Sequence, residues 1–189
     1  MLSISNAPVE TGDRILAAAA SCVIDFGVDR VTLAEIARRA GVSRPTVYRR
    51  WPDTRSVLAT LLTRHITAAL DAVPVRGSGR EALVDRVVAV AEHLRRDDLV
   101  RAVLRSELAL VYIAQRLGSS QQMLIDALAD DLRAAQRGGS VRAGDPRRLA
   151  AMVLLITQST IQSAEIVRPI MDADALAAEL AYSLNGYLS

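Results

Sequence analysis

The sequence predicts an all-α protein, and three observations carry that prediction. Apolar residues make up 51% of the 189 residues but aromatic residues only 3%, so the core has to be built from aliphatic side chains. Alanine and leucine, which are strong helix formers, are abundant. No alternating apolar and polar run predicts a strand, and no hairpin signal is found. Glycine and proline instead separate long runs with helical periodicity.

The first helix is expected over residues 11–26, and it ends at Gly27. Helical spacing gives its buried face: Ile15, Ala19, Cys22 or Val23, and Phe26. We expect Phe26 and Trp51 to be large side chains in a small core. Because the chain has one cysteine, an internal disulfide is excluded, and Cys22 is interpreted as a buried structural thiol rather than a redox sensor.

Residues 32–51, TLAEIARRAGVSRPTVYRRW, organise the rest of the chain. Thr32 and Glu35 have the spacing of a capping box, in which each side chain accepts the other residue's backbone N–H. A short apolar stripe follows: Leu33, Ile36, Ala37 and Ala40. Gly41 stands where a helix end needs a residue tolerant of positive φ. This pattern predicts a short helix and a tight turn.

The second helix of this stretch is expected over residues 44–51. Ser43 suits its N-cap, and Pro45 suits its first turn, where a missing N–H costs little. Val47 and Trp51 share the buried face. The opposite arc carries the polar and basic side chains, with Tyr48 at its boundary: Pro45, Thr46, Arg49 and Arg50. Guanidinium groups suit bidentate contacts with guanine edges or phosphate, so the pattern indicates a helix-turn-helix.

The charge distribution supports the same interpretation. Residues 30–55 hold seven arginines against two carboxylates, Glu35 and Asp53. The segment is therefore +5, whereas the whole chain is only +2. A basic patch on a mildly acidic body is typical of a DNA-binding head. The alternative is that Arg49 and Arg50 form a solvated surface pair.

The residues from ILAAAASCVIDFG to VTLAEIARRAGVSRPTVYRRWPDTRSVLATLL resemble the DNA-binding domain of the TetR (tetracycline repressor) family. The resemblance covers about residues 14–62. The chain departs from the family at Thr54, where a lysine is frequent, and carries Arg55 one place on. The resemblance implies a bacterial transcriptional regulator, usually a repressor, that dimerises through its last two long helices and holds an effector between its body helices.

Further helices are predicted over the rest of the chain. Asp53 begins a fourth helix that runs to about residue 71, and the proline and two glycines of residues 73–79 interrupt the chain. The body helices are expected at residues 80–96, 98–117 (with a break near Arg105), 119–137, 145–167 and 172–188. This gives about nine helices in three parts: an arm and helix-turn-helix domain (1–52), a connecting helix and linker (53–79), and a ligand-binding and dimerisation domain (80–189).

The helix at 145–167 is apolar on more than one side, which is typical of a helix that packs on two faces. One face suits the body and the other suits a second copy; a monomer with this helix at its centre is the alternative. Polar side chains among these helices are candidates for an effector pocket or a polar dimer seam: Tyr112, Gln115, Thr157, Gln158 and Gln162.

The sequence does not predict an enzyme. It has two histidines, one cysteine, no glycine-rich phosphate loop, and no histidine–carboxylate pair at metal-ligand spacing. No cofactor or metal is expected. The start of the chain does not read as a signal peptide, and the longest apolar run, residues 149–156, is shorter than the ~18 residues of a membrane span. We expect a cytoplasmic protein that does not enter a membrane.

The function predicted is therefore a homodimeric, sequence-specific DNA-binding regulator, released from a palindromic operator by a largely apolar small molecule. We expect three arginines to contact base edges or phosphates: Arg44, Arg49 and Arg50. Four further residues are expected to contact phosphates: Thr32, Thr46, Tyr48 and Arg55. Pro45 lies on the same face. The alternative is a dimeric regulator without a ligand, controlled by abundance or by a protein partner. A third hypothesis, from another class, is an enzyme or small-molecule carrier.

Overall fold

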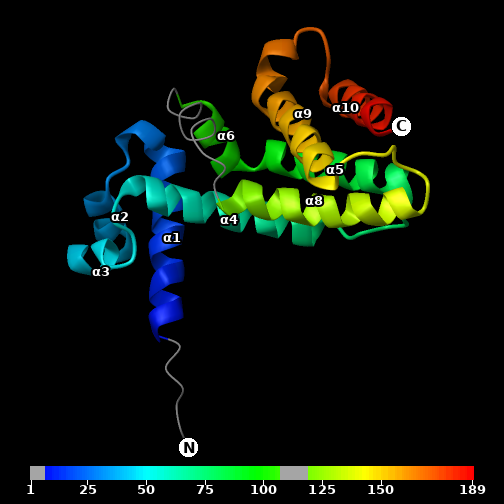
Figure 1. Ribbon diagram of the computed structural model, residues 1–189. Coiled ribbons are helices and arrows are strands. Elements are labelled where there is room, and N and C mark those ends of the chain that lie inside the picture. Colours follow the sequence, from blue (N-terminus) through cyan, green and yellow to red (C-terminus); the bar gives the residue numbers. More distant parts are fainter. Residues whose placement is uncertain (1–6, 107–118) are drawn as a thin grey trace, which may run out of the picture. The chain divides into compact units, whose positions relative to one another are not determined.

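The computed structural model describes residues 7–106 and 119–189, and every regular element in them is a helix (Figure 1). The all-α prediction is confirmed. The elements are α1 (Ala7–Phe26), the 3-10 turn η1 (Val28–Arg30), α2 (Leu33–Ala40), α3 (Arg44–Tyr48), α4 (Thr54–Ala72), α5 (Gly79–Arg96), α6 (Asp98–Leu104), α8 (Ser119–Arg137), α9 (Pro146–Val167) and α10 (Ala173–Leu188).

Helix α1 begins at Ala7, four residues before the predicted start at residue 11, so that prediction is wrong at this end. Capping residues explain why the later predicted helix starts agree with the observed ones. Four aspartates directly before helices accept a backbone N–H of the first turn: Asp53 from Ser56, Asp97 from Val100, Asp145 from Arg147 and Asp172 from Ala175. The predicted helix over 98–117 is observed as α6 up to Leu104, and the break predicted near Arg105 is confirmed, since Arg105 and Ser106 are not helical. Residues 107–117 lie outside the described residues.

The chain divides into two compact units. The unit that we call the head contains Met1–His65 and Asp97–Arg116, and the unit that we call the body contains Ile66–Arg96 and Leu117–Ser189. Helix α4 begins in the head and ends in the body. Residues 73–78 after it are not helical, as Pro74 and Gly77 predict.

The head has its own aliphatic core. Helix α1 contributes one continuous buried face, and α2 packs across it through Leu33, Ile36 and Ala37. Helix α4 adds Val57, Leu58 and Leu61, and α6 adds Leu99 and Val103. Side chains of α1, α2 and α3 that are fully enclosed include Ile15, Cys22, Ile36 and Val47. The helix-turn-helix therefore rests on a core that α1, α4 and α6 complete.

The prediction that Phe26 belongs to this core is wrong, because its side chain is 44% exposed. The chain turns at Gly27, whose φ of 77° suits only glycine without strain, and Val28 then enters the core in place of Phe26. Trp51 is half-buried and packs against the core, as predicted. The Arg39 guanidinium lies 5.0 Å from the centre of the Phe26 ring, which gives this exposed ring a cation–π partner.

The body is built around α9. Helices α5, α8 and α10 all pack on it, and Leu149, Ala150 and Val153 supply its enclosed side. The remaining sides of α9 stay open within one chain, with Leu155 56% and Ile166 78% exposed. Among the described helices, α9 is also the one long and apolar enough to cross a membrane. A helix of a soluble protein that packs on two faces can be equally long and apolar.

Candidate nucleic-acid interface

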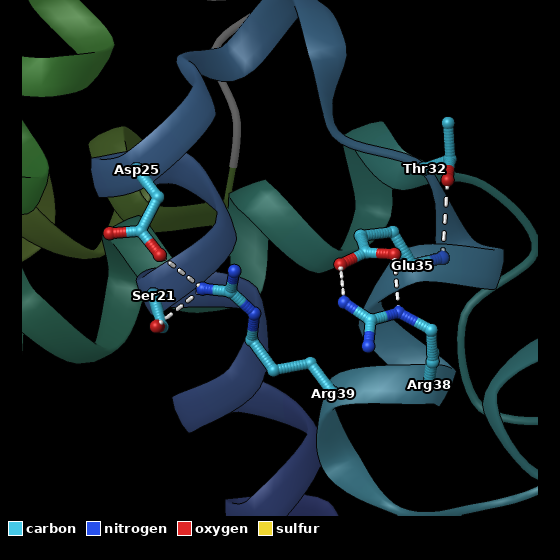
Figure 2. A network of polar contacts seen from close by, with 6 residues as sticks. All are labelled: Ser21, Asp25, Thr32, Glu35, Arg38 and Arg39. Atoms are coloured by element: carbon cyan, nitrogen blue, oxygen red, sulfur yellow. Dashed lines mark hydrogen bonds and ion pairs between the residues drawn. The ribbon is translucent and has the colours of Figure 1, made fainter.

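The N-terminus of α2 forms half of the predicted capping box. Thr32 Oγ1 accepts the Glu35 N–H at 3.2 Å (Figure 2). The Glu35 carboxylate does not return to the Thr32 N–H, as a full capping box requires. It accepts two hydrogen bonds from Arg38, at 2.9 and 2.6 Å, and these hydrogen bonds lower the pKa of Glu35. A bidentate guanidinium one turn away is the stronger partner for a carboxylate.

The turn after α2 depends on Gly41 and on a side chain from α1. Gly41 adopts the left-handed conformation with φ 64° and ψ 37°, and its N–H closes the helix on Ala37 and Arg38 carbonyls. Arg14 Nη2 donates to the Ala40 carbonyl at 2.7 Å. A cation at a helix C-terminus satisfies an otherwise unpaired carbonyl and complements the helix dipole. Sequence reasoning missed Arg14, because its role comes from tertiary contact.

Helix α3 is shorter than predicted, since it ends at Tyr48 rather than at Trp51. Arg49 keeps a helical conformation, but the chain then closes with a tighter bond from the Arg50 N–H to the Val47 carbonyl. Pro52 explains the early end, because the residue before a proline is disfavoured in the helical region. The guanidinium of Arg50 therefore extends from a turn that follows the helix.

Ser43 stands at the N-cap of α3, as predicted, but its hydroxyl does not cap the helix. It lies 2.8 Å from the Thr46 hydroxyl, and the Thr46 N–H bonds to the Ser43 carbonyl instead. Thr46 is half-buried, and its hydroxyl already has the Ser43 hydroxyl as a polar partner. A phosphate contact from Thr46 has to be shared with Ser43.

The two faces of α3 separate as the sequence predicts. Val47 is fully enclosed and is the buried residue of the helix. Arg44, Pro45 and Arg49 are exposed, and Tyr48 is 52% exposed. After the helix, the Trp51 indole donates to Thr60 Oγ1 of α4 at 3.0 Å and anchors the turn. The predicted site residues Thr32, Arg50 and Arg55 are exposed as well.

Two pairs of arginines in this region differ in their partners, and Figure 2 shows the first pair, Arg38 and Arg39. Arg38 is paired with Glu35, and Arg39 donates to Ser21 at 2.7 Å and to Asp25 at 2.5 Å on α1. The hydrogen bond that Arg39 donates to Asp25 raises the pKa of Arg39. Within residues 7–106 and 119–189, by contrast, no side chain or backbone group pairs with the guanidinium of Arg44 or Arg49. These two guanidiniums are available to a partner.

The predicted effector residues are only partly described. Tyr112 and Gln115 lie outside the described residues. On α9, Thr157 is buried and donates its hydroxyl to the Val153 carbonyl at 2.8 Å, while Gln158 and Gln162 are half-buried. A small cavity between α5, α9 and α10 has other lining residues, among them Glu92, Arg95, Thr160 and Leu180. With a volume of about 10 Å³, it has space for a single water.

One histidine that could carry chemistry, His65, has a structural partner. His65 Nδ1 of α4 lies 2.6 Å from Asp97 Oδ2, at the start of α6. Burial raises the pKa of Asp97, but hydrogen bonds from the Val100 N–H and His65 lower it by more, so the net pKa is below its ordinary value. Burial raises the pKa of the Cys22 thiol. Among the described residues, no group of three or more His, Cys, Asp or Glu could hold a metal.

Comparison with known proteins adds independent findings. The family model for bacterial regulatory proteins of the tetR family matches residues 15–61. Over 188 residues, covering 100% of both chains, the sequence is 69% identical to an HTH-type transcriptional regulator of Mycobacterium bovis.

Solved structures share the fold. The transcriptional repressor QsdR of R. erythropolis superposes with a TM-score of 0.70 at 18% identity, covering 95% of both chains. RolR in complex with its ligand resorcinol superposes with a TM-score of 0.71 at 18% identity, covering 96% of this chain and 89% of that one.

Proposed function

Because the chain belongs to the TetR family of bacterial regulatory proteins, we propose that it is a homodimeric repressor of transcription that a small molecule releases from a palindromic operator. The observation that carries the DNA-binding part is the outer arc of α3. Arg44 and Arg49 have no partner among the described residues, although Arg38 and Arg39 nearby are both paired with carboxylates. An unpaired pair of guanidiniums on a short helix suits base edges and phosphates.

In this proposal α3 enters the major groove, and Arg44, Arg49 and Arg50 contact base edges or phosphates. The neighbouring polar groups position the head on the backbone: Thr32, Thr46, Tyr48 and Arg55. Pro45 lies exposed at the start of α3, on the same face. Two copies place their α3 helices in successive major grooves, roughly 34–36 Å apart.

The dimer forms through α9 and α10. On α9 the exposed apolar residues Met152, Leu155 and Ile166 recur at helical spacing on one side. On α10, Tyr182 is 79% exposed, and the small residues Ala178 and Gly186 are exposed beside it. Apolar side chains exposed at this regularity on two adjacent helices are stabilised by burial against a second copy.

Release by a small molecule is the part of the proposal that rests on relatives. RolR, which shares the fold, binds resorcinol. An effector lowers DNA affinity only if it binds the conformation that does not fit the operator more tightly. The alternative is a dimeric regulator without an effector, controlled by abundance or by a protein partner. Release of bound DNA by a compound from a small-molecule screen distinguishes the two.

The test of DNA recognition is a titration against DNA from upstream of the protein's own gene, with unrelated DNA as competitor, at two salt concentrations. Arg49→Ala is expected to weaken specific binding by about 1–3 kcal/mol if Arg49 contacts a base. The matched control is Arg148→Ala, which removes the same charge from an 89% exposed side chain of the body.

The two variants separate a DNA contact from a general loss of charge. The proposal predicts that Arg148→Ala binds like the original protein, whereas Arg49→Ala loses specific affinity or lowers the salt slope by about one. Equal binding by both variants would remove Arg49 from the interface. If unrelated competitor DNA abolishes the binding, then the protein does not recognise the sequence of the upstream fragment.

A further inference from the structure

One turn of α1 contacts three separate parts of the head. Asp13 Oδ1 accepts a hydrogen bond from Arg64 Nη1 of α4 at 2.7 Å. Arg14 Nη2 donates to the Ala40 carbonyl at the end of α2. Gly12, directly before them, lies against the Arg50 side chain that follows α3. Residues 12–14 therefore contact the end of α2, the turn that follows α3, and α4.

A side chain at position 12 fits only if the guanidinium of Arg50, the far end of a flexible side chain, moves away. A Cβ built on Gly12 would lie 2.6 Å from Arg50 Nη1 and 3.7 Å from Arg50 Cζ. Real Cβ atoms essentially never approach another heavy atom within 3.0 Å. Gly12 is itself buried, whereas Asp13 and Arg14 beside it are exposed. The guanidinium of Arg50 thus occupies the volume that any other residue at position 12 would fill.

Local folding gives no reason for a glycine at this position. Gly12 lies inside the 20-residue helix α1, where glycine is the poorest helix former after proline. Its backbone is not in the left-handed region that would require glycine. The close approach of Arg50 is the feature that a larger residue would disturb.

We propose that Gly12 is a positioning residue for Arg50, because its missing side chain lets the guanidinium lie against α1 and so fixes where Arg50 meets DNA. This inference rests on the proposed function, in which Arg50 contacts DNA. A long flexible side chain loses conformational freedom when it binds, and a surface that already confines it reduces that loss. A methyl group at position 12 displaces the guanidinium from this surface.

The test compares the original protein with Gly12→Ala, Arg50→Ala and the double variant. The probe is the duplex that the original dimer enriches from a random-sequence pool, and an unrelated duplex of equal length is the reference. Arg50→Ala is expected to lose about 5- to 150-fold in affinity for the enriched duplex, the equivalent of 1–3 kcal/mol. Gly12→Ala is expected to lose at least about threefold, and not more than Arg50→Ala.

The double variant and the melting temperature identify the cause. Alanine is the better helix former, so Gly12→Ala is expected to melt at an equal or higher temperature than the original protein. In the Arg50→Ala background, Gly12→Ala is expected to change DNA binding by less than about twofold. This combination of results assigns the effect of Gly12 to Arg50.

Other results would overturn the inference. Unchanged or tighter binding by Gly12→Ala refutes it, provided that Arg50→Ala binds more weakly. So does an equal loss in both backgrounds, or a lower melting temperature, since each assigns the effect to the fold of α1. If Arg50→Ala binds both duplexes like the original protein, then the proposed DNA contact of Arg50 fails first, and the inference fails with it.

Discussion

Helix α3 has five residues and is held by one enclosed side chain, so Val47→Ala should loosen it. A helix this short is not stable by itself. The substitution removes two methyl groups from a side chain with no exposed surface. At about 0.8 kcal/mol for each buried methylene equivalent, with a further cost for the cavity, the head should lose about 2 kcal/mol of unfolding free energy.

The chain provides its own probe and its own control for this experiment. Trp51 is the single tryptophan, and it packs against the head core and donates to Thr60, so its fluorescence in a urea titration reports on the head. Val75→Ala is the matched control, because the same two methyl groups are removed from a side chain that is 64% exposed. That change should stay within about 0.5 kcal/mol.

DNA binding by Val47→Ala should also weaken, although Val47 faces away from any partner. Affinity is measured at a temperature where the Trp51 signal shows a folded head. Equal urea midpoints for Val47→Ala and Val75→Ala would show that Val47 is not the anchor of α3. A lower midpoint with unchanged DNA affinity would show that Trp51 and the flanking turns hold α3 without it.

Three further predictions concern the body, the α6 cap and the thiol. Leu155→Asp, on the exposed side of α9, should shift the protein from dimer to monomer in sedimentation, whereas Met123→Asp on α8, also exposed, should not. Because the folded pKa of Asp97 is lowered, its stabilisation is present above the unfolded pKa and is lost as pH falls below about 4. Asp97→Asn should therefore reduce the fall in the free energy of unfolding as the pH is lowered. Asp98→Asn, which changes a side chain that is 77% exposed, should leave that fall unchanged. Cys22, enclosed and with a raised pKa, should resist iodoacetamide in the native state, as mass spectrometry would show, and react once the head unfolds.

Helix positions were predictable because their signals are local. The N-cap aspartates and the prolines and glycines between helices act within a few residues, and the observed ends follow them. The buried faces of α1 and α2 follow from helical periodicity, which depends only on backbone geometry. Phe26 was misplaced because the periodicity continues to the last turn, while the chain itself leaves the helix at Gly27.

Side-chain partners were not predictable in the same way. The sequence allows Glu35 to bond either to Thr32 or to Arg38, and the choice depends on the geometry of two hydrogen bonds to one guanidinium. The contacts of Arg14 with Ala40 and of Arg50 with Gly12 join residues at least 26 positions apart. No local pattern contains them, so they appear only once the helices are packed.

The charge of the helix-turn-helix segment shows why these contacts matter for function. Seven arginines occur in residues 30–55, but a carboxylate already pairs with Arg38 and another, from α1, with Arg39. An arginine that is already paired with a carboxylate has to break that ion pair before it can neutralise a phosphate. It therefore contributes less to the release of counterions from DNA than an unpaired arginine does. The basic segment therefore has two roles. Arg38 pairs with Glu35 within α2 and Arg39 joins α2 to α1, whereas Arg44 and Arg49 have no carboxylate partner among the described residues and are the arginines that we propose for DNA contact.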